Sequence, residues 1–311
     1  MRHNSLNANS RLYSSQNPQP PAGGFVEVDA FAKINLFLAV TGKRPDGYHE
    51  LVSVMQSLEL CDRISICKSN TGNNPVQLEI DNPYLPTGDK NLVVKAAKLL
   101  VKEYGLNEPI KIRLNKHIPV GAGLGGGSSD AAATMHGINQ LFGLGISFNK
   151  LIELGKTIGA DVPFCLMGGT ALAKGIGEIL TPLAPLPSCY VVLACLPVHV
   201  STRAIFKCLG PQFQSLDIGG FMAAYEAQDV AAVAKNFKNT FTPITSEIHP
   251  QISTVISELQ NLGAMGACMT GTGATVFAYF NSGNNAKKAR NILKQQYKDI
   301  RIFVTRSIGS N

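Results

Sequence analysis

The sequence predicts an α+β fold with two domains, and three observations carry this expectation. Apolar residues alternate with polar ones in some segments, as in half-buried strands, and recur every three to four residues in others, as in amphipathic helices. These segments follow one another without the strict alternation of a doubly wound parallel sheet. The 311 residues are enough for two cores, and the segment 181–187, with three prolines in seven residues, is the strongest linker signal between them.

We therefore expect a first domain over residues 25–183 and a second over residues 184–311. Residues 1–24 are rich in Asn, Ser, Gln and Pro and contain no acidic residue, so we expect a disordered extension. Its two arginines and its serines bear a faint resemblance to an organelle transit peptide. We expect a cytoplasmic protein, with the plastid as the alternative if this extension is a targeting segment.

Composition excludes several classes of function. The seven cysteines form no Cys-x-x-Cys pair, and the six histidines show no spacing typical of a zinc site. The formal charge of +7 suits an anionic ligand, but the basic residues are dispersed, so we expect no nucleic-acid partner. No run of 18 apolar residues occurs, so we expect no membrane span. We expect small-molecule partners and a monomer or weak homodimer.

The chain becomes strand-like at Phe25 and then enters an apolar run over residues 31–40. Lys33 and Asn35 carry the only polar side chains of that run. Because they are two residues apart on a strand, they share a face. An ammonium in so apolar a setting needs an anion nearby, and two interpretations stay open: a structural ion pair or a ligand-binding lysine.

A turn follows at Arg44-Pro45-Asp46-Gly47, where proline presets φ and glycine accepts positive φ. Tyr48 and His49 come directly after it. The pair is interpreted either as a packed ring beside a solvated imidazole, or as a ring that stacks on a base beside an imidazole that hydrogen-bonds it.

Further strands are expected at residues 64–66, 76–80 and 110–114, and a helix over residues 91–104 that Gly105 ends. A glycine-rich segment follows the last of these strands, with five glycines between Gly121 and Gly127. Ser128, Ser129 and Asp130 behind it are N-cap and first-turn residue types, and apolar spacings of four and three continue to residue 142. The order strand, glycine loop, helix start predicts an anion site, with a phosphate as its ligand.

Several kinds of glycine loop bind phosphate in this way, and two of them can be tested first. A Walker A loop is rejected, because Gly127 and Ser128 stand where its lysine and hydroxyl would be. A dinucleotide fingerprint is disfavoured, because the next element, residues 148–158, reads as a second helix and not as a strand ending in an acid. A glycine-rich turn without a ligand stays an alternative.

Asp161 follows that second helix in an almost wholly apolar segment. Pro163 should force Val162 into an extended conformation, which places Asp161 at a junction. A carboxylate in such surroundings is paired or has a raised pKa, and either condition marks a candidate acid or base. Lys33 and Asp161 are opposite lone charges, and we expect them to pair.

The later part of the chain is expected to hold a buried strand at residues 190–196, a helix at 252–262 and a strand at 274–280. A final helix and the strand 300–304 follow.

The glycine segment closely resembles the nucleotide loop of the galactokinase, homoserine, mevalonate and phosphomevalonate (GHMP) kinases. The family's other two motifs are present in order, at residues 32–36 and 269–277. The resemblance covers residues 25–304 and implies an N-terminal domain carrying the ATP loop and a ferredoxin-like C-terminal domain. Pro45 to Leu51, Gly159 to Phe164 and Gly175 to Glu178 resemble the branch that phosphorylates the 2-hydroxyl of a cytidyl diphosphate substrate with ATP and Mg²⁺, in the non-mevalonate isoprenoid route.

Residue by residue, the resemblance implies that Asp161 is the base and Lys33 the cation beside it. Asn35 would orient the substrate, and Tyr48, His49 and Phe206 would hold the cytosine. The implied nucleotide contacts are Asn91, Lys116, Pro119, Gly121, Gly123, Leu124, Gly125, Gly126, Gly127, Ser128, Ser129, Thr272 and Gly273. Thr270 and Thr272 stand where serine is common in the family, and they keep the hydroxyl. Rival interpretations are another GHMP kinase, a nucleotide-binding regulator without catalysis, and an oxidoreductase.

Overall fold

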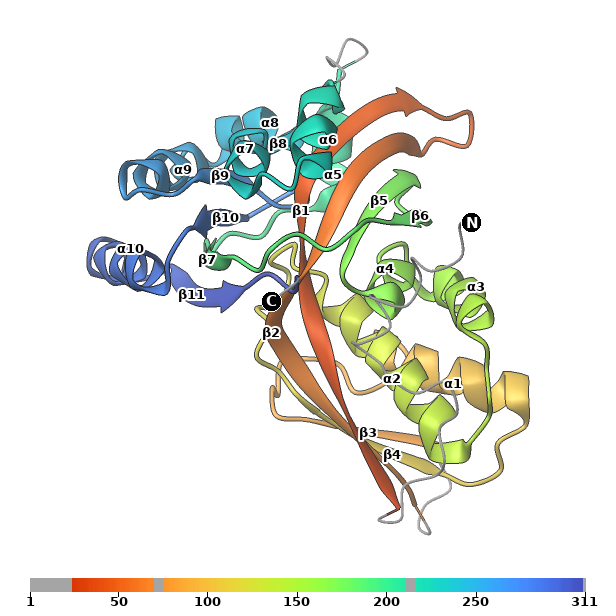
Figure 1. Ribbon diagram of the computed structural model, residues 1–311. Coiled ribbons are helices and arrows are strands. Elements are labelled where there is room, and N and C mark those ends of the chain that lie inside the picture. The colour runs from red at the N-terminus through yellow and green to blue at the C-terminus, as the bar shows by residue number, and fades with distance from the viewer. Residues whose placement is uncertain (1–23, 70–74, 211–215, 310–311) are drawn as a thin grey trace. The chain divides into compact units, whose positions relative to one another are not determined.

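The computed structural model describes residues 24–69, 75–210 and 216–309 and combines strands and helices, as the sequence predicts (Figure 1). The expected disordered extension lies outside the described residues, apart from Gly24. Contacts divide the chain into two compact units that do not follow the chain order. Unit 1 is Met1–Ala32, Leu60–Val120 and Gly125–Gly168, and unit 2 is Lys33–Glu59, Gly121–Leu124 and Gly169–Asn311. The boundary expected between residues 183 and 184 stays a prediction.

The sheet of unit 1 uses strands whose inward residues are apolar. Strands β1 (Phe25–Lys43) and β2 (His49–Lys68) are long and pass from one unit to the other. In unit 1, β2 pairs antiparallel with β4 (Ile110–Asn115), and β3 (Val76–Ile80) pairs with β4 in parallel. The strand predicted at residues 110–114 is confirmed, and its alternate residues Ile110, Ile112 and Leu114 are buried.

Four helices complete unit 1. They are α1 (Leu92–Tyr104), α2 (Gly126–Phe142), α3 (Phe148–Ile158) and α4 (Val162–Met167). Their apolar faces and the inner face of the strands form one hydrophobic core, which includes Leu100, Ile138 and Leu154. Helix α1 ends at Gly105, which has φ +61°, as the sequence predicts.

Helix α2 begins earlier than expected. Its N-cap is Gly125, with φ +69° and no side-chain cap, so Ser128 and Ser129 lie in the first turn and neither caps the helix. The expectation of a serine cap was wrong because a left-handed glycine brings the chain into the helix without a side-chain oxygen. The bare backbone therefore continues directly into the first turn.

Val162 is the first residue of α4, so the expectation of an extended Val162 was wrong. A proline at the second helical position is tolerated because the N–H it lacks would have no partner within the helix. Asp161 is consequently the N-cap residue of α4 and not the end of an extended junction.

The C-terminal part of unit 2 contains a four-stranded antiparallel sheet, drawn in green to blue in Figure 1. Its order is β11 (Arg301–Arg306), β7 (Tyr190–Cys195), β10 (Thr275–Phe280) and β9 (Gly266–Met269). Helices α9 (Gln251–Asn261) and α10 (Gly283–Gln296) precede β9 and β11. This strand order and connection make the ferredoxin-like arrangement that the family resemblance implies.

Unit 2 also contains short elements, and the strands among them pair with β1, β2 or each other in the larger, seven-stranded sheet. Strand β2 also pairs with β5 (Thr170–Gly175), which pairs with β6 (Ile179–Pro182), and β1 pairs in parallel with β8 (Lys238–Asn239). The helices are α5 (Thr202–Cys208), α6 (Gly219–Glu226), α7 (Val230–Lys235) and α8 (Phe241–Ile248).

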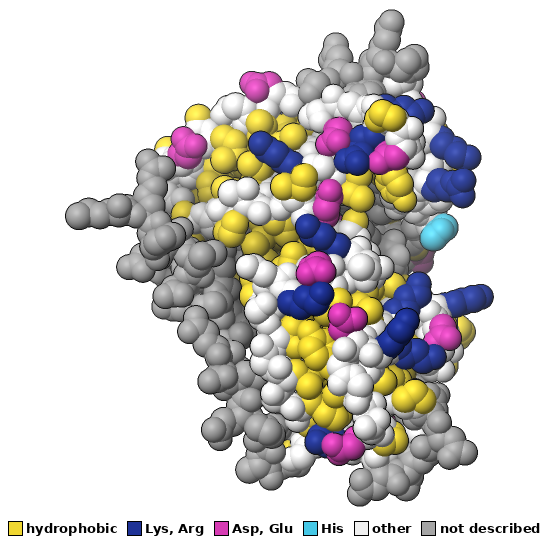
Figure 2. Space-filling model, turned by 90° about the vertical axis from the view of Figure 1, so that its right-hand side faces the viewer, with side chains coloured by type: hydrophobic (Ala, Val, Ile, Leu, Met, Phe, Trp, Pro, Cys, Tyr) yellow, Lys and Arg dark blue, Asp and Glu magenta, His cyan; other side chains and the backbone are white. Residues whose placement is uncertain are grey.

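Two further features of the described residues are the distribution of surface charge and the length of the helices. On the face drawn in Figure 2, Lys and Arg side chains are interspersed with Asp and Glu, without a stripe of one sign. Within the described ranges, no helix has both the length and the apolarity that a membrane crossing requires.

Gly266 gives a test of packing in unit 2. A Cβ there would overlap the backbone carbonyl of Ala234, which follows from the close packing of α7 on β9. We expect Gly266→Ala to lower the free energy of unfolding by about 3 kcal/mol, because backbone cannot move aside as a flexible side chain can. Gly42→Ala is the control, since its Cβ would meet only the Glu50 Cβ, at 3.8 Å. Urea denaturation measures both, and equal stabilities would contradict the packing.

Candidate active site

Lys33 and Asn35 form a buried polar pair on β1, in unit 2. Their side chains are 5% and 2% exposed. Lys33 Nζ donates to Asn35 Oδ1 at 3.0 Å, so the two side chains share a face as predicted. The backbone N–H of Lys33 donates to the carbonyl oxygen of Leu124 at 3.0 Å. The backbone of Lys33 is therefore held beside the first half of the glycine loop.

The orientation of the Asn35 amide is determined by its neighbours. Its Nδ2 donates to Ser53 Oγ at 2.9 Å, and Ser53 Oγ donates to the Phe37 carbonyl at 2.7 Å. The Asn35 Oδ1 must then face the Lys33 ammonium. Ser53 is 1% exposed and was not identified from the sequence, because a single serine in a strand has no distinguishing pattern.

Thr270 connects this pair to the third motif. Its Oγ1 accepts the backbone N–H of Asn35 at 3.0 Å and lies 3.3 Å from Asn35 Oδ1. Thr272 is 9% exposed, and its Oγ1 lies 3.1 Å from the Oγ1 of Thr202 at the start of α5. We name residues 269–273 the third loop.

Gly123 packs its backbone directly on the third loop. A Cβ at this position would lie 3.1 Å from the Thr270 carbonyl oxygen and 3.2 Å from that of Gly273, and φ is +76°. Both the left-handed backbone and the close approach require glycine here. Gly121 also has positive φ, but nothing lies within 4 Å of its Cβ position.

The second half of the glycine loop opens α2 in unit 1. The first N–H groups of a helix have no acceptor within the helix, and with the helix dipole they favour an anion. Gly127 is exposed there, whereas Gly126 packs tightly, with its Cβ position 3.1 Å from Ile118 Cγ2. Pro119 is buried at the end of the segment that enters the loop.

The two serines of the first turn differ in environment. Ser129 is fully buried, and its Oγ donates to the Phe31 carbonyl at 2.7 Å. Ser128 is partly exposed, and its Oγ lies 3.9 Å from the Cβ position of Gly159, two residues before Asp161. Ser128 thus keeps its hydroxyl near the start of α4, whereas the Ser129 hydroxyl stabilises the fold.

Asp161 stands at the N-terminus of α4, and the residues that follow it in the helix are buried. A polar contact joins α4 to α2, because His136 Nε2 lies 3.3 Å from the carbonyl oxygen of Leu166. Burial lowers the pKa of His136 to about 4, so this histidine is neutral at physiological pH. Lys33 belongs to unit 2 and Asp161 to unit 1, and their expected pairing stays a prediction.

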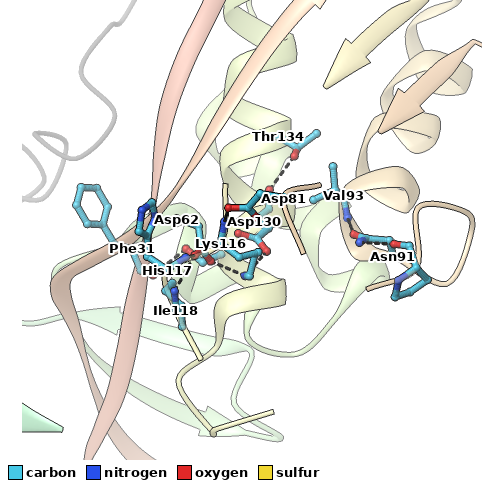
Figure 3. Close-up of polar contacts among 12 residues, drawn as sticks. Phe31, Asp62, Asp81, Asn91, Val93, Lys116, His117, Ile118, Asp130 and Thr134 are labelled. Atoms are coloured by element: carbon cyan, nitrogen blue, oxygen red, sulfur yellow. Dashed lines mark hydrogen bonds and ion pairs between the residues drawn. The ribbon is translucent and has the colours of Figure 1, made fainter. Parts of the chain in front are cut away.

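Lys116 and Asn91 make structural contacts, as Figure 3 shows. Lys116 Nζ donates to Asp130 Oδ2 at 2.7 Å and also to Asp62 Oδ2, with its side chain 7% exposed. Asn91 Oδ1 accepts the Val93 N–H at 2.9 Å, and its Nδ2 donates to the Pro86 carbonyl at 2.9 Å. Asn91 therefore caps α1, and asparagine is among the residues preferred at this position.

The Lys116 cluster contains two carboxylates and one ammonium. Asp62 Oδ1 also accepts the backbone N–H groups of His117 and Ile118, so Asp62 is satisfied as an anion. Burial raises the pKa of Asp130 to about 8, Lys116 acts against this shift, and the charge of Asp62 adds to it. Burial alone would lower the pKa of Lys116, but the two carboxylates raise it. With a pKa of about 8, the Asp130 carboxyl is mostly protonated at neutral pH.

The three predicted substrate residues lie in or beside the hairpin between β1 and β2. Tyr48 is 61% exposed, and its N–H donates to Asp46 Oδ1 at 3.1 Å. The His49 ring lies 5.2 Å from the Phe206 ring, which packs edge-on against Phe241 at 4.7 Å. Burial, with a smaller effect of Lys43, lowers the pKa of His49 and favours its neutral form.

Comparisons with known proteins agree with the sequence motifs. The model described as GHMP kinases N terminal domain matches residues 91–169, and GHMP kinases C terminal matches residues 221–299. A 4-diphosphocytidyl-2-C-methyl-D-erythritol kinase of Clostridium perfringens is 40% identical over 288 residues, 92% of this chain and 99% of that one. The chain belongs to the GHMP kinases. It is therefore a small-molecule kinase whose co-substrate is ATP.

Further relatives and solved structures extend this result. A protein of the same name from Caldicellulosiruptor saccharolyticus is 42% identical, over 89% of this chain and 95% of its own. The crystal structure of a 4-(cytidine 5'-diphospho)-2C-methyl-D-erythritol kinase matches with a TM-score of 0.78 at 31% identity, over 92% of this chain and all of that chain. A homoserine kinase from Cytophaga hutchinsonii, at 20% identity and a TM-score of 0.75, shows the shared fold.

In this GHMP kinase, unit 2 brings together Lys33, Asn35, Leu124 and the third loop, and it separately joins His49 to Phe206. Sequence motifs identified these residues. They did not identify Ser53 or Asp62, and they named Asp130 only as a residue of the helix start, because the contacts of these three side chains depend on the tertiary fold.

The buried Asp130 predicts a pH dependence of stability. The pKa of Asp130 rises from 3.8 to about 8 on folding, so the folded state binds the extra proton and loses stability as pH rises between these values. The slope is at most about 1.4 kcal/mol per pH unit. Asp130→Asn should remove that loss and be the more stable protein at pH 8.

Thermal unfolding at pH 5 and pH 8 measures this difference, and Asp89→Asn, an exposed acid that pairs with Lys98, is the control. If the stability of the wild-type protein relative to Asp130→Asn does not change with pH, the raised pKa of Asp130 is contradicted.

Proposed function

We propose that this kinase transfers the γ-phosphoryl group of ATP to the 2-hydroxyl of 4-diphosphocytidyl-2-C-methyl-D-erythritol. The products are the 2-phosphate and ADP, in the non-mevalonate route to isoprenoid precursors. Relatives with this name match nearly their whole length. The observation that carries the proposal is the buried Lys33 ammonium, joined through Asn35 to the third loop and through its own backbone to the glycine loop.

The proposed chemistry needs one base and one cation. Asp161 takes the proton of the attacking hydroxyl, and Lys33 is the cation that steadies the reacting groups. Lys33 also stabilises the negative charge that develops on the transferred phosphoryl oxygens. Asn35 orients the acceptor alcohol, and its amide is already held by Ser53.

Backbone amides do most of the proposed nucleotide binding. Gly121 to Ser128 bring bare backbone and a helix N-terminus to the triphosphate, and Thr272 and Gly273 approach it from the third loop. Leu124 contributes through its backbone, whose carbonyl accepts the Lys33 N–H. For Asn91, Lys116 and Ser129 the nucleotide role stays a prediction, since their side chains have the structural partners described above.

Mg²⁺ is part of the proposal, and the donor set fits it. No cluster of three or more metal-binding side chains exists among residues 24–69, 75–210 and 216–309. Mg²⁺ typically uses few protein ligands together with substrate phosphates. The Ser128 hydroxyl, which is partly exposed, would hold it with the triphosphate, and the ion would neutralise charge on the phosphate oxygens.

Tyr48, His49 and Phe206 are the proposed cytosine-binding residues. An exposed phenol ring and a neighbouring imidazole–phenyl pair offer aromatic faces to a base, and the neutral imidazole offers one donor and one acceptor. A substrate without a base, such as mevalonate or homoserine, needs none of these rings. We keep the expectation of a cytoplasmic monomer or weak homodimer, and the relatives described above are bacterial.

Asp161→Asn tests the proposed base. The amide keeps the shape but cannot accept the proton, so kcat should fall by about 10²–10⁴-fold while the KM for both substrates changes little. A coupled assay of ADP release measures both constants. Asp217→Asn, a surface carboxylate, is the control, and turnover by Asp161→Asn equal to that of Asp217→Asn excludes Asp161 as the base.

His49→Ala tests the identity of the acceptor. The loss of one hydrogen bond and one ring contact should raise the KM for the cytidyl substrate by about tenfold or more and leave the KM for ATP within about twofold. The same ADP-release assay, with each substrate varied in turn, gives both values. An equal rise of the two KM values would argue for a different acceptor.

A further inference from the structure

The third loop is held by two buried side chains that the sequence motifs do not include. Asn239, at the end of β8, is 5% exposed. Its Nδ2 donates to the carbonyl oxygens of Met269 and Gly271, each at 2.8 Å. Its Oδ1 accepts the backbone N–H of Phe241 at 2.9 Å. Both ends of the amide are therefore used, and its orientation is unambiguous.

Thr245, on α8, makes the second contact. It is fully buried, and its Oγ1 donates to the carbonyl oxygen of Thr272 at 3.2 Å. Its Cγ2 lies 3.2 Å from the Cβ position of Gly273. Asn239 and Thr245 together hold the carbonyls of residues 269, 271 and 272 on one side of the loop.

The direction of each carbonyl in the third loop also determines the direction of the next backbone N–H. In a planar trans peptide, the carbonyl of one residue and the N–H of the next point in opposite directions. Because the Gly271 carbonyl points at Asn239, the Thr272 N–H points away from it. The neighbouring Gly273 N–H is turned back to the Thr270 carbonyl, at 3.1 Å. Thr272 thus offers an outward amide from a loop whose other carbonyls are held.

We propose that Asn239 and Thr245 are positioning residues for ATP: they hold the third loop so that the Thr272 amide faces the bound phosphates. Neither side chain touches the nucleotide. This inference rests on the proposed function of the third loop. It explains why a buried asparagine on a two-residue strand gives both of its amide hydrogens to one loop.

Asn239→Asp is the decisive variant. The carboxylate has the same shape and still accepts the Phe241 N–H, so the start of α8 and the Phe241 ring beside Phe206 are preserved. The Nδ2 group, which donates to the Met269 and Gly271 carbonyls, is replaced by a carboxylate oxygen. This oxygen repels the two carbonyl oxygens and so displaces the third loop. We expect the KM for ATP, and the Kd for MgATP measured by titration calorimetry, to rise about tenfold or more. The KM for the cytidyl substrate should stay within about twofold.

Matched controls separate positioning from general damage. Asn236→Asp makes the same charge change on α7's C-terminal end, where Asn236 Nδ2 donates only to the Ala232 carbonyl, at 2.9 Å, and it should leave both KM values within about twofold. Thr245→Val removes the hydroxyl at constant shape and should raise the KM for ATP by about three- to tenfold, whereas Thr245→Ser keeps the donor and should restore it.

The inference would be overturned if Asn239→Asp bound ATP as tightly as Asn236→Asp does. It would also be overturned if Asn239→Asp raised the KM values for ATP and for the cytidyl substrate equally. If Asn239→Asp does not fold, the Thr245→Val and Thr245→Ser pair decides, and equal ATP affinities of these two proteins would overturn it. Calorimetry with MgATP needs no acceptor, so a wild-type protein that fails to phosphorylate the cytidyl substrate would refute the proposed function alone.

Discussion

The close approach of Gly123 to the third loop is the constraint on which the rest of the proposed phosphate site depends. Only a hydrogen fits between the Gly123 Cα and the carbonyls of Thr270 and Gly273. This contact joins two glycine segments that are almost 150 residues apart in the chain and lets both present bare backbone. The carbonyl of Leu124, the residue after Gly123, accepts the Lys33 N–H, so the motif at residues 32–36 lies beside the same loop.

Charge is placed around these loops in two different ways. Lys33 is buried, and its ammonium donates to the neutral side-chain amide of Asn35. Lys116 is buried as well, but its ammonium is shared between Asp62 and Asp130. Lys116, which the family resemblance implies as a nucleotide contact, thus stabilises the segment that enters the glycine loop.

The fold class, most element positions and the three motifs could be read from the sequence because they depend on local periodicity and glycine content. The two local errors have a common cause. A serine cap was expected where Gly125 begins α2, and an extended Val162 where α4 begins, since propensity describes the average helix start and not the one that packing selects. The contacts of Asn35 with Ser53, of Lys116 with Asp62 and of Asn239 with Met269 span 18 or more residues, and no local pattern indicates them.

The sequence by itself determined which residues are chemically unusual: a lysine and an asparagine in an apolar strand, an acid in an apolar segment, and two glycine loops. Only the tertiary structure decided how those groups are oriented. The Asn35 amide faces Lys33 because Ser53 accepts from its Nδ2, and the Thr272 N–H points away from Asn239 because Asn239 holds the Gly271 carbonyl. Orientation depends on hydrogen bonds between distant segments, and these form only when the chain has folded.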